Sequence, residues 1–324
     1  MLEGRRKYTE DRFKGLQDKL VASEQRCKDR ACVYATGSFA RGEAHQWSDL
    51  DLFIVGQDVN GKRLLSRLDE IRVKADLIEV TQQAGIPDFS GDGRYLEHYT
   101  SSHLTRTLGK PEDDAANTFT ARLLLLLESR PLIGKDIYDL VLDDVISAYW
   151  QDYIDHKNNF VPAFLANDIL RLWRTFCVNY EARTLRQPDE EKAKRKLKNY
   201  KLKFSRLLTC YSAILFLLAS HVENGTVSTD DAKQMVSLTP TERLEWLQSK
   251  DAIGPVRHGI KGLLSSYENF LVNTAHPEAE LVQKFLQRET SRQYFAEAAD
   301  FGEQMFRVLD TVGQGKPFYR MLVV

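Results

Sequence analysis

Cysteine is scarce in this chain of 324 residues, and its four cysteines form no Cys-x-x-Cys pair. That absence excludes zinc-ribbon and thioredoxin-type motifs. Because so small a number of cysteines is typical of a reducing compartment, we expect a cytoplasmic protein. The seven histidines show neither His-x-x-x-His nor His-Glu-x-x-His spacing, which argues against a zinc site. The chain also lacks a Walker A sequence, a Gly-x-Gly-x-x-Gly and a Gly-x-Ser-x-Gly elbow, three signatures of known enzyme classes.

A dominant charge of one sign is also missing, since 45 Lys and Arg face 46 Asp and Glu. The chain therefore has no global basic field that would hold nucleic acid. The longest apolar run, Leu207–Val222, is short for a membrane span and contains Thr, Ser and His. We expect it to be a buried helix and expect no membrane association. Residues 1–15 are charged, unlike a secretory signal.

The composition is that of a globular protein, with 43% apolar and 28% charged residues. Apolar spacing predicts helices over 8–29 and 61–84 and strands over 31–36, 50–55 and 94–100. From residue 113 the pattern is almost wholly helical. The predicted helices there are 114–130, 135–153, 161–183, 192–222, 228–236, 239–249, 252–273, 277–288 and 290–313. We therefore predict an α+β fold, with a small mixed-sheet domain over 1–112 and an α-helical bundle over 113–324.

The most informative stretch is residues 37–55, GSFARGEAHQWSDLDLFIV. Asp49 and Asp51 are separated by one residue, and such residues of a strand project from the same face. Two carboxylates placed in this way suit a hard divalent cation such as Mg²⁺. The apolar residues that follow would bury the far end of the strand in a sheet.

A turn upstream of the two carboxylates has the composition of a phosphate-binding loop. Gly37 allows a close backbone approach to a phosphate, and Ser38 offers a hydroxyl donor. The next residues resemble the start of a helix, whose amides favour anions, and Arg41 adds a positive charge. A phosphate-holding turn beside a metal-binding strand is what transfer of a nucleotidyl group requires.

These residues resemble the DNA polymerase β-type nucleotidyltransferase superfamily, whose pattern is Gly-Ser, then Arg-Gly, then Asp-x-Asp. The form RGE-x-x-x-x-SD-x-D is similar to that of the PII uridylyltransferases and their stand-alone relatives. The resemblance implies that Gly37 and Ser38 hold the triphosphate and that Asp49 and Asp51 bind metal ions. The PII-modifying enzymes themselves also carry a phosphohydrolase domain with an adjacent His-Asp pair, and this chain has no such pair. We therefore expect no reverse reaction.

The resemblance also implies a third carboxylate on a neighbouring strand, which would orient or deprotonate the attacking hydroxyl. Glu97, in the predicted strand 94–100, is the first candidate for this role. Asp92, in the preceding loop, is the alternative. Asp76 and Glu79 rank lower because they fall on a helical pattern.

A basic run covers residues 192–206, where eight of fifteen residues are Lys or Arg. Its downstream end leads into the apolar helix, so Lys203 and Arg206 should be ordered. They could line the triphosphate cleft. The alternatives are a solvated face, which is usual for charge runs, and an RNA-contacting patch.

Together these features predict a nucleotidyltransferase that uses Mg²⁺, or Mn²⁺ in its place, and an NTP, with ATP or UTP favoured. The acceptor would be a hydroxyl of a protein or small molecule, since a neutral chain suits long nucleic acids poorly. Two catalytic alternatives remain open, a cyclic-oligonucleotide synthase and an RNA-end nucleotidyltransferase. A third is a non-catalytic module that senses nucleotides or pairs with a partner as an antitoxin does.

Overall fold

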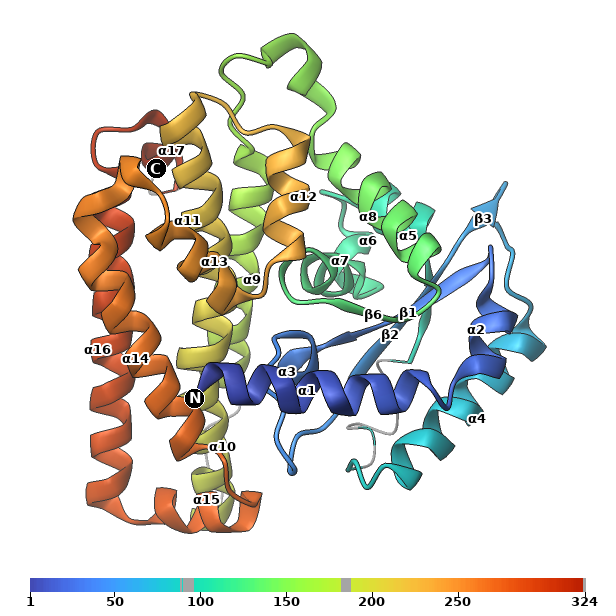
Figure 1. The fold of residues 1–324 in the computed structure, drawn as a ribbon, viewed down its shortest axis with the longest axis horizontal. Helices are drawn as coiled ribbons and strands as arrows, with labels where there is room; N and C mark the ends of the chain where they lie inside the picture. Colours follow the sequence, from blue (N-terminus) through green and yellow to red (C-terminus); the bar gives the residue numbers. More distant parts are fainter. Residues whose placement is uncertain (88, 90–95, 182–187, 323–324) are drawn as a thin grey trace. The chain divides into compact units, whose positions relative to one another are not determined.

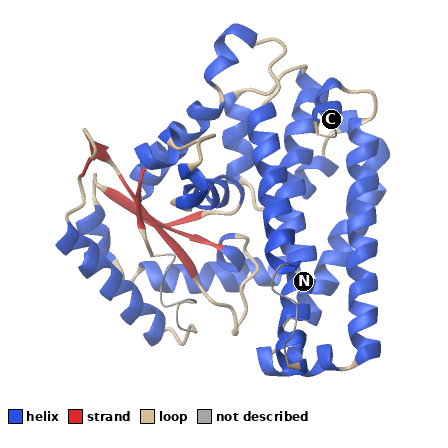
Figure 2. Cartoon of the chain, turned by 180° about the vertical axis from the view of Figure 1, so that it is seen from behind, coloured by secondary structure: helices blue, strands red, loops and turns tan. Residues whose placement is uncertain are grey.

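The computed structural model describes residues 1–87, 89, 96–181 and 188–322. The chain folds into two compact units, Met1–Gln151 and Asp152–Val324. The described strands all belong to the first unit, and the second is helical (Figures 1 and 2). The predicted α+β class, with a mixed sheet first and helices after it, is confirmed at this level.

The first unit contains, in chain order, α1 (Leu2–Gln17), α2 (Val21–Cys27), β1 (Ala31–Thr36), α3 (Gly37–Ala40), β2 (Asp51–Gly56), β3 (Asp58–Val59), β4 (Lys62–Arg63), α4 (Arg67–Gln83), β5 (His98–Thr100), α5 (Ser101–Arg106), α6 (Glu112–Ala115), α7 (Thr118–Leu127), β6 (Arg130–Ile133) and α8 (Lys135–Tyr149).

A mixed four-stranded sheet, in the order β5-β2-β1-β6, forms the centre of this unit. β1 is antiparallel to β2 and β6, whereas β2 is parallel to β5. All six residues of β1 are buried, because helices cover both faces of the sheet (Figure 1). Val33 and Ile54 belong to the core that α1, α2 and α4 complete. On the other face, Tyr34 stacks on Phe53 and donates a hydrogen bond to Ala121 O in α7.

The predicted boundary between residues 112 and 113 is wrong, because the chain returns to the sheet beyond it. β6 follows α7 and pairs antiparallel with β1, with Val33 opposite Ile133 and a register shift between Val33 and Tyr34. Tyr138 of α8 also packs against Tyr34 of β1. The strand escaped prediction because it has only four residues and contains Pro131, which is tolerated at a sheet edge.

The sequence 57–66 forms a hairpin rather than the first turn of the predicted helix 61–84. β3 and β4 pair around Asn60 and Gly61, which both have positive φ angles. An Asn-Gly pair supplies the twist that a two-residue hairpin turn requires. α4 begins afterwards at the N-cap Ser66, whose side chain accepts a hydrogen bond from Asp69 N.

The second unit contains η2 (Gln151–His156, which spans the boundary), α9 (Ala163–Glu181), α10 (Asp189–Lys201), η3 (Leu202–Arg206), α11 (Leu207–Asn224), α12 (Thr229–Ser237), α13 (Pro240–Gln248), η4 (Asp251–Val256), α14 (Arg257–Asn273), α15 (Glu278–Leu286), α16 (Arg288–Gly313) and α17 (Pro317–Met321).

α10, η3 and α11 form one continuous helix at the centre of this unit. Within the described chain, this helix alone is long and apolar enough to cross a membrane, by length and composition only. Its most apolar window is 78% buried inside the protein, which agrees with the buried helix predicted over 207–222. The π-helical turn η3 directs Phe204 into an aromatic cluster with Phe270 and Phe301.

Candidate functional site

Gly37 brings the end of β1 against the first residue of β2. Thr36 lies opposite Asp51 in the antiparallel register, so the chain turns beside that carboxylate. Gly37 has a φ angle of +68°, and a Cβ built on it would lie 3.1 Å from Asp51 Oδ2. Only glycine adopts this backbone readily and leaves room for the carboxylate. The Gly-Ser turn and the Asp-x-Asp segment therefore meet at one edge of the sheet, as predicted.

Asp49 and Asp51 flank the buried Leu50 at this edge. Asp51 begins β2 and is partly exposed, whereas Asp49 is exposed in the loop before the strand. The prediction that one strand carries both is therefore correct only for Asp51. Burial still alternates from 49 to 52, so both carboxylates retain access to solvent while Leu50 and Leu52 enter the core.

Ser48 organises the loop immediately before Asp49. Its buried hydroxyl accepts a hydrogen bond from His45 N at 3.0 Å, and its own amide donates to His45 O at 2.9 Å. The ring of His45 in turn accepts from Trp47 N through Nδ1 at 3.1 Å. These bonds close a compact turn and limit the positions that Asp49 can take. His45 therefore shapes the loop.

The hydroxyl of Ser38 is buried and has no hydrogen-bond partner among the described residues. Ser38 follows Gly37 in the short helix α3, and Gly37 is the residue whose added Cβ would lie 3.1 Å from the Asp51 carboxylate. Buried hydroxyls in native proteins are almost always paired, so an orphaned one next to a carboxylate edge calls for a ligand. A phosphate oxygen is an acceptor that would satisfy it, which fits the predicted role of Ser38.

Arg41 does not have the surroundings predicted for it. Its buried guanidinium donates through Nε to Glu43 Oε2 at 2.8 Å and through Nη1 to Glu128 Oε2 at 2.9 Å. Two carboxylates thus compensate its charge, which favours a positioning role, and a contact of Arg41 with a phosphate stays a prediction. The pair ties the loop after α3 to the end of α7. Sequence reasoning missed Glu128 because it lies 87 residues from Arg41.

Glu97, the first candidate for the third carboxylate, is exposed and immediately precedes β5 rather than lying in a strand. Tyr99, two residues later, packs on Phe53 of β2, and alternation assigns position 97 to that same face. In the part of the chain that the structure describes, no three His, Cys, Asp or Glu side chains form a metal-binding group. Asp92, the alternative, lies outside the described residues.

Lys203 and Arg206 belong to the second unit, in the π-helical turn η3. Lys203 Nζ lies 5.8 Å from the centre of the Phe295 ring, and Arg206 Cζ lies 5.3 Å from that of Phe176. Both side chains are half-buried, as predicted for ordered residues. π-Helical turns occur frequently at functional sites. Their contact with a triphosphate remains a prediction.

The upstream part of the basic run is a solvated helix face. Lys192 pairs with Asp189, and Lys194 pairs with Glu190 and Glu191, all within the first turns of α10. The hydrogen bond and charge of Glu191 raise the pKa of Lys194. For this part of the basic run, the alternative of a solvated helix face therefore holds.

The donors at the sheet edge fit a magnesium ion that shares its coordination with a substrate. Mg²⁺ is usually bound by one or two carboxylates together with phosphate oxygens and water. Asp49 and Asp51 supply the carboxylates, and the orphaned Ser38 hydroxyl supplies a donor for a phosphate. A complete protein cage is not needed for such an ion.

Comparison with protein families agrees with this geometry. Residues 20–87 match the family model described as a nucleotidyltransferase domain. The match includes Gly37, Ser38, Asp49 and Asp51 and ends before Glu97 and the second unit. No curated protein and no solved structure matches the chain. The nucleotidyltransferase domain points to transfer of a nucleoside monophosphate in general.

Proposed function

We propose that the protein is a Mg²⁺-dependent nucleotidyltransferase that moves an NMP unit from an NTP to an acceptor hydroxyl. The acceptor is a protein or a small molecule, and pyrophosphate is released. ATP or UTP is the favoured donor, and Mn²⁺ would serve in place of Mg²⁺. Within the wider family, the RGE-x-x-x-x-SD-x-D form favours a stand-alone relative of the PII uridylyltransferases.

The observation that carries this proposal is the close approach of Gly37 to the Asp51 carboxylate, which leaves 3.1 Å between Asp51 Oδ2 and the position that a Cβ at residue 37 would take. It joins a turn that can approach phosphates to a segment that can bind metal. Ser38 extends the same turn with a hydroxyl that has no partner in the described chain. Both halves of a nucleotidyl-transfer site are then within reach of one triphosphate.

In the proposed reaction, Ser38 donates a hydrogen bond to the outer phosphates of the NTP. Asp49 and Asp51 would hold Mg²⁺, which when bound lowers the pKa of the acceptor hydroxyl and neutralises the leaving pyrophosphate. The acceptor oxygen bonds to the α-phosphorus as the bond to the β-phosphate oxygen breaks. Glu97 is proposed to take the proton from the acceptor hydroxyl, which balances the step.

Lys203 and Arg206 are proposed to contribute positive charge to the triphosphate. Cations that approach the β- and γ-phosphates stabilise the charge that develops on the leaving group. Within the second unit, Lys203 Nζ lies over the Phe295 ring and Arg206 Cζ over the Phe176 ring, so both positive charges are ordered.

A second candidate function is a nucleotide-binding module without catalysis. The observation that favours it is the lack of a third acidic ligand beside Asp49 and Asp51 in the described chain. Such a module would bind an NTP and Mg²⁺ but would not transfer the nucleotide. RNA ends and second nucleotides remain further acceptor classes for the catalytic proposal.

Incubation with each α-³²P-labelled NTP and Mg²⁺ tests the proposal and separates these candidates. Label that moves to protein, to RNA or to a new small molecule identifies the acceptor class. Nucleotide bound in calorimetry without transfer, when cell extract supplies the acceptors, supports the module. No binding of any NTP contradicts both candidates.

A further inference from the structure

α4 carries apolar side chains on its solvent side as well as on its buried side. Leu68, Ile71 and Ile78 are 70%, 54% and 43% exposed, and Ala75 between them is exposed too. Their spacing of three, four and three residues places all four on one stripe of the helix. We call this stripe, Leu68, Ile71, Ala75 and Ile78, the α4 face.

The α4 face is not needed for the packing of α4 on the sheet. A separate set of residues, Val73, Leu77 and Val80, is buried in the core of the first unit. Scattered exposed apolar side chains are ordinary, but a contiguous row at helical spacing marks an interaction site. Its alternating spacing of three and four residues is that of the apolar positions at which two helices of a coiled coil pack together.

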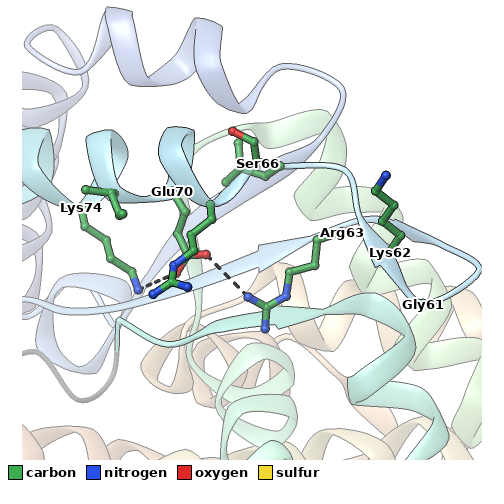
Figure 3. Close-up of a pocket in the computed structure, with 9 residues that line it drawn as sticks. Gly61, Lys62, Arg63, Ser66, Glu70 and Lys74 are labelled. Carbon is green, nitrogen blue, oxygen red and sulfur yellow. Dashed lines mark hydrogen bonds and ion pairs between the residues drawn. The ribbon is translucent and has the colours of Figure 1, made fainter.

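Positive charges border the α4 face. Arg67 and Lys74 of α4 line a cavity of about 760 Å³ together with Lys62 and Arg63 of the neighbouring hairpin (Figure 3). Ile71 of the α4 face also lines this cavity, so the apolar stripe and the basic cavity are continuous. Arg72 is exposed one residue after Ile71. Of the other acids of α4, Asp69 pairs with Arg30 and Asp76 with Arg26, and Glu79 lies next to Ile78.

Much of this positive charge is uncompensated. Glu70 accepts from Lys74 Nζ at 2.6 Å and lies 3.6 Å from Arg63 Nη1 (Figure 3). Its carboxylate also meets His98 Nδ1 at 3.1 Å. Lys62 and Arg67 form no ion pair with any described residue. One acid therefore faces four cations around the cavity.

We propose that the α4 face docks an acidic amphipathic helix of a partner protein. The apolar side chains of that helix would cover Leu68, Ile71 and Ile78, and its flanking Glu or Asp residues would reach the cations of the cavity. Proteins commonly bind such a helix on an apolar surface that contacts its side chains at a spacing of three and four residues. Complementary charge would select an acidic partner and speed the encounter.

The same observations disfavour other occupants. A second copy of this chain seated on the cavity would bring four cations and a single acid, Glu70, against the same set. A nucleic acid would gain from the cations, but the α4 face offers no aromatic side chain on which a base could stack. An anionic membrane would meet a stripe of only four apolar residues, with no Trp or Phe to anchor it.

The test uses the full chain and two synthetic helices of about 18 residues, roughly five turns. Both carry Leu at spacing of three and four, and their flanking positions are Glu in one and Lys in the other. Fluorescence anisotropy at about 0.1 M salt, where exposed charges still interact over ~10 Å, measures the affinity. We expect the Glu helix to bind about tenfold more tightly than the Lys helix.

Substitutions locate the site. Ile71→Ser and Arg67→Glu should each weaken binding of the Glu helix about fivefold or more, as at a central contact. Leu140→Ser is the matched control, because Leu140 on α8 is 53% exposed and lies outside the α4 face. It should leave the affinity unchanged. Circular dichroism confirms that each variant is folded.

Four results would overturn the proposal. Equal affinities for the Glu helix and the Lys helix would show that charge does not select the partner. A loss of affinity in Leu140→Ser as large as that in Ile71→Ser would show that the α4 face is not the site. A dimer in sedimentation that Leu68→Ser converts to a monomer assigns the face to a second copy. Binding to vesicles of phosphatidylcholine and phosphatidylserine that Ile71→Ser abolishes assigns it to a membrane.

Discussion

Gly37 and Asp51 lie so close at the edge of the sheet that a Cβ at position 37 would be 3.1 Å from Asp51 Oδ2. Gly37 directly follows β1, which ends at Thr36, and Asp51 begins the antiparallel neighbour β2. This proximity links the phosphate-binding half of the proposed site to its metal-binding half. The positive φ angle of Gly37 makes the link sensitive to any side chain.

Gly37→Ala should therefore reduce nucleotidyl transfer by about tenfold to a hundredfold in kcat/KM, because a displaced carboxylate misaligns the reacting groups. It should also cost about 1–2 kcal/mol of unfolding free energy from the left-handed backbone. Gly85→Ala is the control, since Gly85 has φ +64° with nothing within 4 Å of its added Cβ. Equal activity losses in both variants would mean that backbone strain alone is responsible.

Arg41 should behave as a structural residue. Its removal in Arg41→Met leaves the buried Glu43 and Glu128 without their cation, which should lower the unfolding free energy by about 3–5 kcal/mol. Urea unfolding measures this loss. Arg307→Met is the control, because the Arg307–Glu303 pair is exposed and should contribute less than about 1 kcal/mol. Unchanged stability with weaker NTP binding would restore the phosphate role of Arg41.

His98 should make stability depend on pH. Burial lowers its pKa below the usual 6.5, and the hydrogen bond to Glu70 opposes this only in part. The native state therefore favours neutral His98, with Nδ1–H donating to Glu70. The contribution of neutral His98 to the free energy of unfolding is complete above the pKa that His98 has in the unfolded chain, about 6.5. It is lost as the pH falls from that value toward the lower pKa of His98 in the folded protein.

Glu70 should add to this loss at more acidic pH. Burial opposes ionisation of its carboxyl, but hydrogen bonds from Lys74 and His98 outweigh it and lower its pKa below 4.5. Its contribution is present above that value and disappears as pH falls through the folded pKa. Unfolding free energies of the wild type and His98→Gln between pH 7 and 5 isolate the histidine.

The wild type should lose stability more steeply than His98→Gln over that range. One proton limits the difference in slope to about 1.4 kcal/mol per pH unit. His221, whose pKa is also lowered by burial, accounts for dependence that remains in the variant. Parallel pH curves would show that His98 titrates alike in both states.

Lys203 provides a test of the proposed triphosphate contact. Lys203→Met retains an apolar stem against Phe295 but removes the charge, so it should weaken NTP binding about tenfold in calorimetry. Lys201→Met, two residues upstream and exposed, should leave the affinity unchanged. Equal affinities of the wild type and Lys203→Met would remove Lys203 from the site.

The local sequence pattern predicts secondary structure most accurately where a segment is buried on one face along its length or on all faces. The strand over 31–36 was predicted to the residue because six apolar or small residues stand between charged and glycine positions. The helices of the second unit followed their spacing in the same way. Gly37, Ser38, Asp49 and Asp51 were found because they lie within one short stretch.

Long-range partners escaped the sequence because spacing along the chain does not encode them. β6 joins the sheet through pairing with β1, some hundred residues away, as the Val33–Ile133 pair shows. The partners of Arg41 and Glu70 are likewise set by tertiary packing. The sequence does not distinguish the α4 face, because its apolar residues and the core residues of α4 together form one helical pattern.

Transfer of label from α-³²P-NTP tests the central claim most directly, with the wild type beside Asp49→Asn and Asp51→Asn. Asp11→Asn, an exposed residue of α1, is the control. We predict Mg²⁺-dependent transfer by the wild type and the control, and a loss of about a thousandfold or more in the two site variants, which remain folded by circular dichroism. Transfer that survives both substitutions would contradict the account.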